Sequence, residues 1–181
     1  MALAQDELAY LESAQQSLSL AKTEEDLAEI RAELAAGGYM ISASKEKKKK
    51  QPESKPLHFV SSDGFDIYVG KNNVQNDRLT LRFANSADLW FHTKNFPGSH
   101  TVIKLGLDKN VPERTIIEAA SLAAYHSSAR GSAQVPVDYT QIKNVKKPSG
   151  AKPGMVIYDH YNTLYVTPDE ELALRLTQNH M

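Results

Sequence analysis

The 181-residue sequence contains no cysteine, and this absence removes several classes of chemistry at once. Disulfide bonds, thiolate nucleophiles, cysteine zinc fingers and iron–sulfur clusters all require that residue, so none of them is expected here. The composition is compatible with a reducing compartment. Only histidine and carboxylate side chains remain as metal ligands, and their spacing matches no established metal motif. We therefore expect no metal and no cofactor.

Long apolar runs are missing as well. No stretch of the sequence approaches the roughly 18 apolar residues that a membrane-spanning helix requires. The acidic N-terminal segment also lacks the basic-then-apolar order of a secretory signal. The sequence therefore predicts no membrane insertion and a cytoplasmic location.

Charge is distributed unevenly along the chain, although the formal net charge is only −1. Residues 1–44 contain eight acidic residues against Lys22 and Arg31, a net charge of −6 that leaves +5 on the remainder. Five lysines lie between Lys45 and Lys50. The pattern indicates an acidic arm joined to a mildly basic body, and a positive field of this size favours polyanionic partners.

The apolar spacing of the first 41 residues predicts two helices separated near Lys22. Thr23 is a good N-cap for the second helix, and Gly37 and Gly38 supply its end. Such narrow apolar stripes fit either the end of a longer coiled coil or a helix pair packed on its own domain. Residues 42–56 are too polar to bury apolar area, which predicts a flexible basic linker.

The apolar and turn patterns of residues 57–168 predict an α+β domain, and residues 169–181 are expected to form a C-terminal tail. The expected fold is a mostly antiparallel β-sheet packed against one main helix, preceded by an α-helical hairpin arm. The expected elements are a hairpin of residues 57–60 and 65–69, a short helix over 74–83, paired strands over 88–94 and 99–105, the main helix over 112–129, a strand over 135–142, and a hairpin of 155–159 with 163–166.

His92, Lys94 and His100 lie on the two central paired strands, and the register of the pair decides which face each side chain occupies. If the loop covers residues 95–98, Lys94 faces Ser99 and the histidines point to opposite faces. If Ser99 joins the loop, Lys94 faces His100 and all three side chains share one face, which would suit RNA phosphates or stacked bases. Trp90 is expected in the core.

Two loops concentrate further polar and basic side chains. The first contains Lys71 as a candidate phosphate ligand with three asparagines, which alternatively serve only as local helix caps. The second is shaped by glycine and proline and exposes its lysines, either as phosphate contacts or as solvated surface. The complete set of candidate nucleic-acid-binding residues is Lys71, Asn72, Asn73, Asn76, His92, Lys94, His100, Arg130, Lys143, Lys146, Lys147 and Lys152.

No pattern of residues indicates catalysis. Ser99 precedes His100 but lies on no recognisable nucleophile turn. The glycines and lysines match no nucleotide-binding P-loop. The chain is therefore expected to bind rather than to act as an enzyme.

Five motifs in order resemble the NFACT-R domain of the RqcH and fibronectin-binding protein family, also called the NFACT family. They are VGKNN at 69–73 with Asn76 and Asp77, DLWFH at 88–92 with PGSH at 97–100, AA at 119–120 with LAAY at 122–125, VDYT at 137–140, and VKKP at 145–148 with GAKPG at 150–154. Residues 24–40 are similar to the end of the family's coiled-coil region.

The resemblance implies a role in ribosome quality control. Members of the family bind the large ribosomal subunit and tRNA and support alanine tailing of stalled nascent chains, with the R module as the RNA-binding part. Gram-positive members are also described as fibronectin- or fibrinogen-binding adhesins displayed on the cell surface without a signal peptide. The expected function is therefore tRNA or rRNA binding, and the alternative is adhesion.

Overall fold

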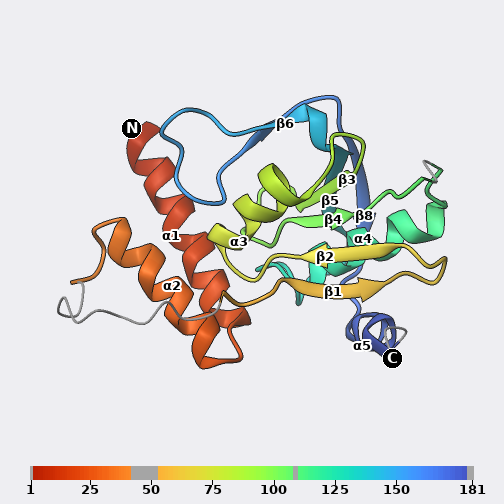
Figure 1. Ribbon diagram of the computed structural model, residues 1–181, viewed down its shortest axis with the longest axis horizontal. Coiled ribbons are helices and arrows are strands. Elements are labelled where there is room, and N and C mark those ends of the chain that lie inside the picture. Colours follow the sequence, from red (N-terminus) through yellow and green to blue (C-terminus); the bar gives the residue numbers. More distant parts are fainter. Residues whose placement is uncertain (1, 42–52, 108–109, 179–181) are drawn as a thin grey trace.

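The computed structural model describes residues 2–41, 53–107 and 110–178 as an α+β fold (Figure 1). The expected fold class, with its helical arm and mostly antiparallel sheet, is confirmed. The lysine run at 45–50 and most of the expected linker at 42–56 lie outside the described residues. No helix among the described residues is long and apolar enough to cross a membrane.

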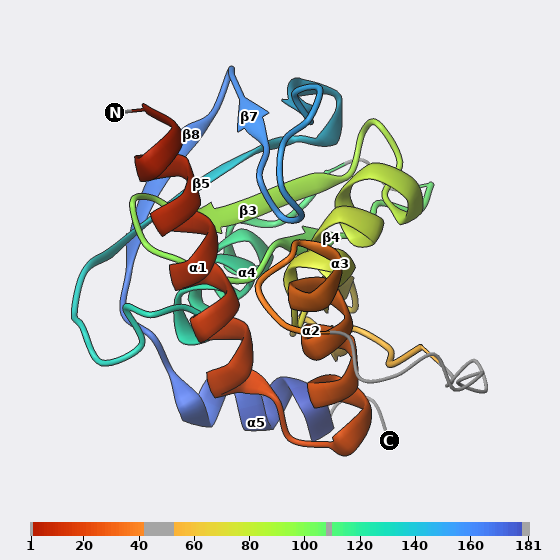
Figure 2. The ribbon, with the colours of Figure 1, turned by 90° about the vertical axis from the view of Figure 1, so that its left-hand side faces the viewer.

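The arm consists of α1 (Ala2–Leu20) and α2 (Glu24–Ala36), which lie side by side against one end of the body (Figure 2). Thr23 begins α2 as expected, because its hydroxyl accepts a hydrogen bond from the backbone N–H of Asp26 while the Asp26 carboxylate accepts one from the backbone N–H of Thr23. Tyr10, Ala14 and Ile30 are buried. The structure shows the helix pair packed on the body, and whether it also forms the end of a longer coiled coil stays a prediction.

The body contains one six-stranded antiparallel sheet in the order β1-β2-β4-β3-β5-β8. The strands are β1 (Leu57–Val60), β2 (Asp66–Val69), β3 (Leu89–Thr93), β4 (Thr101–Ile103), β5 (Val135–Gln141) and β8 (Asn162–Val166).

One face of the sheet is covered by α4 (Glu113–Tyr125), with α5 (Glu170–Gln178) packed beside it on β1. The small side chains of α4 are buried and allow the helix to approach the strands closely, as the sequence indicated: Ala119, Ala120, Ala123 and Ala124. Where the sequence suggested a C-terminal tail from 169, the structure has α5, because Leu172 and Leu176 bury their side chains in the same core.

The opposite face is covered by α3 (Asn73–Arg78), the π-helical turn η1 (Leu79–Phe83) and a second, two-stranded sheet. That sheet pairs β6 (Val145–Lys146), which follows the 3-10 turn η2 (Ile142–Asn144), with β7 (Ile157–Tyr158). The expected hairpin of 155–159 with 163–166 is wrong, because β7 pairs with β6 and β8 pairs with β5.

The β3–β4 register differs from both registers considered from the sequence. Trp90 lies opposite Val102 and Phe91 opposite Thr101, so the same alignment brings His92 opposite His100. The two imidazole rings meet edge to face with centroids 5.5 Å apart. They therefore share the face that carries α3 and the small sheet, and Trp90 is fully buried beside them as expected.

Candidate nucleic-acid interface

The loop at residues 70–75 docks the arm onto the body. Lys71 Nζ lies 2.5 Å from Asp26 Oδ1, and only 14% of the Lys71 side chain is exposed. Burial by itself would raise the pKa of Asp26, but hydrogen bonds from Lys71 and from the backbone of Lys22 hold it below its ordinary value. Lys71 is therefore committed to an internal ion pair.

The neighbouring asparagines continue this contact along α2. Asn72 caps α3 by accepting from the Gln75 N–H, and its amide donates to Glu29 Oε2 at 2.7 Å. Asn73 donates to Glu33 Oε1 at 3.0 Å, where the Tyr10 hydroxyl also donates. Burial raises the pKa of Glu33 despite these two donors. The asparagines thus make more than local caps, because two of them connect the arm to the body.

Asn76 and His100 hold a third connection, within the body. The Asn76 side-chain oxygen accepts from the His100 backbone N–H at 3.1 Å. His100 Nε2 lies 3.1 Å from the Gly154 carbonyl, which only accepts, so Nε2 carries the hydrogen and Nδ1 accepts from the Thr80 hydroxyl at 2.7 Å. Burial, with His92 nearby, lowers the pKa of His100 well below 6.5. His100 is therefore a neutral structural group.

Two lysines of the second loop are also engaged inside the protein. Lys147 Nζ lies 2.9 Å from Asp77 Oδ2 and donates to the carbonyl of Lys152 at 2.7 Å, which closes the loop. Lys152 Nζ donates to the Tyr39 hydroxyl at 2.6 Å and lies 5.0 Å from the centroids of the Tyr10 and Tyr39 rings. The loop that precedes β7 therefore reaches the arm, as Figure 2 shows.

Three lysines near the β7–β8 connection are accessible to a partner, although Lys94 also forms an ion pair with Asp138. Lys143 and Lys146 are exposed and form no ion pair with any described residue. Lys94 is 39% exposed, with Nζ 3.8 Å from Asp138 Oδ1 and 5.0 Å from the centroid of the exposed Tyr161 ring. We call Lys94, Lys143, Lys146 and Tyr161 the open cationic rim.

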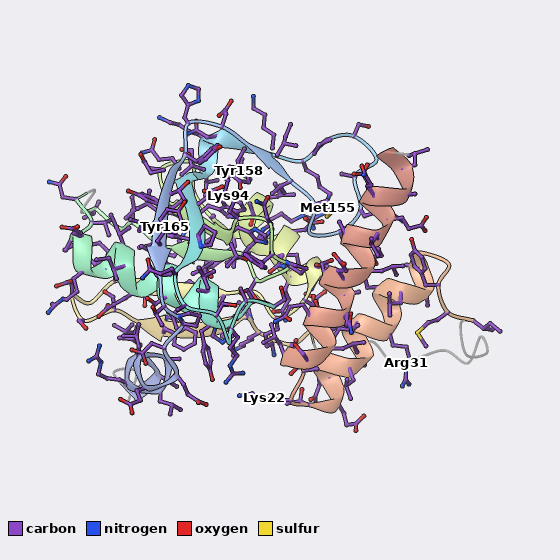
Figure 3. All side chains as sticks on the ribbon, turned by 180° about the vertical axis from the view of Figure 1, so that it is seen from behind. Lys22, Arg31, Lys94, Met155, Tyr158 and Tyr165 are labelled. Atoms are coloured by element: carbon purple, nitrogen blue, oxygen red, sulfur yellow. The ribbon has the colours of Figure 1, made fainter. Side chains whose placement is uncertain are left out.

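The members of the open cationic rim lie on or next to the segments around β6 and β7. Tyr161 lies 5.3 Å from Tyr158 of β7, and β7 pairs Ile157 with Lys146. Lys143 and His160 line one cavity of about 500 Å³. Figure 3 shows Lys94 and Tyr158 on the body, with Lys22 and Arg31 well away on the arm. Arg130 lies elsewhere, at the end of α4, where it covers the Tyr125 ring and approaches Glu170.

A smaller cavity of about 280 Å³ opens between α1, the β3–β4 loop and the segment before β7. Its walls include the Trp90, His92 and Tyr158 rings, and the exposed Phe96 also lines it. Burial lowers the pKa of His92, so its ring is uncharged at neutral pH. The Trp90 indole N–H has no hydrogen-bond partner in the described part of the chain.

Tyr158 and Tyr161 were not identified from the sequence as residues of this region. Tyr158 donates to Asp138 Oδ2 at 2.7 Å, and its ring lies 4.8 Å from Trp90. Their partners come from segments far apart in sequence, so no local pattern marked them. Within the described residues there is also no group of three or more His, Asp or Glu side chains that could hold a metal ion.

Comparison with known proteins adds to this geometry. Residues 55–159 match the family described as "NFACT protein RNA binding domain". The chain belongs to the NFACT family. Residues 1–53 match the family described as "NFACT N-terminal and middle domains". The arm and the body therefore match different domains of the NFACT family. The resemblance drawn from the five motifs is confirmed.

Several NFACT relatives align with most of the chain. The "Rqc2 homolog RqcH" of Bacillus subtilis is 46% identical over 179 residues, which are 98% of this chain and 31% of that protein. The "Ribosome quality control complex subunit NEMF" of Homo sapiens is 30% identical over 73 residues, 40% of this chain and 7% of that protein. The chain therefore spans about a third of the RqcH relative.

A solved structure shares the fold across both segments. The structure of the C-terminal part of the fibronectin/fibrinogen-binding protein from Streptococcus suis superposes with a TM-score of 0.86 at 43% identity. The match covers 95% of this chain and 68% of that one, so the arm and body occur together in that NFACT relative too.

Proposed function

We propose that this chain binds RNA through the open cationic rim, and that it does so as a binding module without catalysis. The observation that supports this most directly is the division of the lysines. Lys71 and Lys147 are paired with carboxylates, whereas Lys143 and Lys146 are exposed without ion pairs in the described structure. Exposed ammonium groups lose little when they move from water to a phosphate, and they release counterions from the nucleic acid.

The names of the relatives support a proposal about the cellular process. The NEMF relative is named as a subunit of the ribosome quality control complex. We propose that this chain likewise helps its parent protein to engage tRNA and the large ribosomal subunit during alanine tailing of stalled nascent chains, in the cytoplasm.

The test is a charge reversal with a matched control. Lys143→Glu with Lys146→Glu changes the net charge by the same amount as Lys22→Glu with Arg31→Glu, which lie exposed on the arm (Figure 3). Fluorescence anisotropy would follow the binding of labelled tRNA and of single-stranded RNA over a salt titration.

If the three rim lysines each contact a phosphate, log K falls with log salt at a slope of about −2 for single-stranded RNA. The rim variant should reduce the slope to about −0.7 and weaken binding at every salt concentration. The arm variant should keep the wild-type slope. Equal effects of the two variants would show that only net charge matters, and the rim would not be the binding surface.

A second candidate function rests on the structural neighbour, which is named as a fibronectin/fibrinogen-binding protein. We propose adhesion as the alternative, with a partner strand added at a free edge of the sheet. The edge strand β8 exposes Tyr165, which could face such a strand. Binding of the 181-residue chain to immobilised fibronectin that survives nuclease treatment and persists in the rim variant would support adhesion over RNA binding.

A further inference from the structure

We propose that the 280 Å³ cavity between α1 and the sheet binds one unpaired base of a single-stranded RNA, with a preference for guanine, while the sugar–phosphate chain runs outside past Lys94. This inference rests on the proposed RNA-binding function and adds a base-reading site to it.

The walls of the cavity are suited to a flat ring. The Trp90 ring is fully buried and packs against His92, at 10° with centroids 5.9 Å apart, and against Tyr158, at 4.8 Å, so it supports these two half-buried rings, which form the accessible part of the wall. Phe96 lines the same cavity and is 38% exposed. Aromatic faces of this kind hold splayed bases in single-stranded RNA recognition.

The volume of the cavity limits the size of the ligand. Pockets for drug-sized molecules enclose roughly 300–1,000 Å³. A cavity of about 280 Å³ is therefore suited to one small ring system rather than to a folded peptide segment. A single nucleobase is a ligand of that class, and its sugar and phosphate would remain outside.

Most polar groups that line the cavity are already used by the protein. Ser13 and Asn73 bond to each other, Thr93 donates to the Phe96 carbonyl, and His100 is bonded at both ring nitrogens. The exposed Glu12 and Asn95 are different, since neither makes a hydrogen bond to any described residue through its side chain. Apart from the buried Trp90 indole N–H, which also has no partner in the described part of the chain, the groups left to read a ligand are thus one carboxylate and one amide.

This pair of groups favours a base over a phosphate, and guanine over other bases. A carboxylate accepts hydrogen bonds only, so it repels phosphate and selects donors. Guanine presents its N1–H and its N2 amino group side by side, which two carboxylate oxygens of Glu12 can accept together. The Asn95 amide can donate to the adjacent O6.

The surface outside the cavity suits the RNA backbone. Lys94 follows His92 on the same face of the strand, two residues along, and lies 5.0 Å from the exposed Tyr161 ring. Tyr161 in turn lies 5.3 Å from Tyr158 in the cavity wall. A cation and a second stacking surface therefore stand next to the cavity, where the phosphate and the next base would lie.

The arm completes this site. Ala9, Glu12 and Ser13 of α1 line the cavity together with residues of the body. The base site therefore exists only when the segment that matches the middle domain is docked on the RNA-binding domain.

The sole tryptophan of the chain is Trp90, so its fluorescence reports on the cavity without any label. We would titrate the 181-residue chain with a short oligouridylate carrying one central guanosine, adenosine, cytidine or abasic site. The expected result is that the guanosine oligonucleotide changes Trp90 fluorescence and binds most tightly, whereas the abasic one binds weakly with the same salt dependence.

Two variants and a matched control assign the effect to the cavity. Phe96→Ala should weaken binding of the guanosine oligonucleotide by about 5- to 150-fold, the range for loss of one stacked base. Glu12→Gln should lower the preference for guanosine over the abasic site about tenfold or more. Phe83→Ala removes an aromatic side chain that is 47% exposed on η1 and does not line the cavity, and it should leave both values unchanged.

The outcomes separate the two proposals. If the chain binds all four oligonucleotides equally with a salt slope that depends on the rim, RNA binding stands and the base site is overturned. If Phe96→Ala and Phe83→Ala have equal effects, the base site is also overturned. If no oligonucleotide binds at low salt, the proposed RNA-binding function itself fails, and the base site fails with it.

Discussion

Two buried carboxylates on α2, Asp26 and Glu33, have environments that shift their pKa values in opposite directions. Asp26 is held ionised by Lys71 and by the capping hydrogen bonds, so its pKa lies below the ordinary value of 3.8. Glu33 is buried beside Tyr10 and Asn73, no cation among the described residues lies in hydrogen-bond contact with it, and burial raises its pKa. Ionised Asp26 therefore stabilises the folded state, whereas ionisation of Glu33 destabilises it.

We predict different effects of neutralising these two groups. Asp26→Asn removes the partner of a largely buried ammonium and should lower the free energy of unfolding by about 1.5–3 kcal/mol at pH 7. Glu33→Gln keeps an oxygen that accepts from Asn73 and should change stability by less than about 1 kcal/mol. Urea unfolding followed by Trp90 fluorescence measures both. A larger loss for Glu33→Gln would show that the Glu33 charge, and not only its hydrogen bonds, is needed.

The pH dependence of stability follows from the same two shifts. Because the pKa of Asp26 is lowered, its contribution is present above pH 3.8 and is lost as the pH falls through the lowered value. Because the pKa of Glu33 is raised, its contribution is present at low pH and is lost as the pH rises through the raised value. Asp26→Asn should therefore flatten the acid limb of a stability profile, and Glu33→Gln the limb above it.

At the scale of elements, local patterns predicted what local energies determine. The β1–β2 hairpin, the short helix after Asn72, the main helix and most strands lie near the expected positions. The predicted hairpin around Tyr161 and Asn162 was wrong, because a turn pattern does not show which strands pair. In the structure β8 pairs with β5 and β7 pairs with β6, and both partners lie farther away in the sequence. The spacing of Leu172 and Leu176 is typical of a helix, but a pattern of so few residues did not predict α5.

Helix α5 supplies a test of whether the C-terminal segment belongs to the core. Leu176 is fully buried, whereas Leu174 on the same helix is 60% exposed. Leu176→Ala should lower the free energy of unfolding by about 2–5 kcal/mol because it leaves a cavity among packed side chains. Leu174→Ala should change it by less than about 0.5 kcal/mol. Similar small changes for both variants in urea unfolding would indicate that α5 does not pack on the sheet.

The candidate site was less predictable than the fold, for a physical reason. The sequence showed that Lys71, Asn72 and Asn73 form a polar cluster, and a cluster of this kind suits phosphate as well as carboxylate. What decides between them is α2, whose Asp26, Glu29 and Glu33 recur on one helical face and meet that cluster. Their spacing was visible in the sequence, but their partner lies about 40 residues away, and only the tertiary contact reveals it.

For the whole molecule, the charge asymmetry acquires a different meaning once the arm is docked. The acidic arm is not simply a solvated segment beside a basic body, because three of its carboxylates face the loop at 70–75. These contacts occupy Lys71, and the contact with Tyr39 occupies Lys152, so neither lysine is free to bind a polyanion. Under the proposed RNA-binding function, docking of the arm neutralises cations elsewhere and leaves the open cationic rim as the surface for RNA.

If this docking holds the molecule together, the arm and body should open as one unit. In the wild-type chain, the α2 amides should show hydrogen-exchange protection near that of α4, since both would exchange through global unfolding. Lys71→Met with Asn73→Ala removes two donors to α2 carboxylates, so the α2 amides should exchange faster while the α4 amides keep most of their protection. The control Lys146→Ala removes an exposed lysine of the body that does not contact α2 and should leave both helices unchanged. Faster exchange of α4 together with α2 in the double variant would mean that the loop stabilises the body itself, whereas unchanged α2 exchange would mean that Ile30 and its apolar neighbours, and not these polar contacts, hold the arm in place.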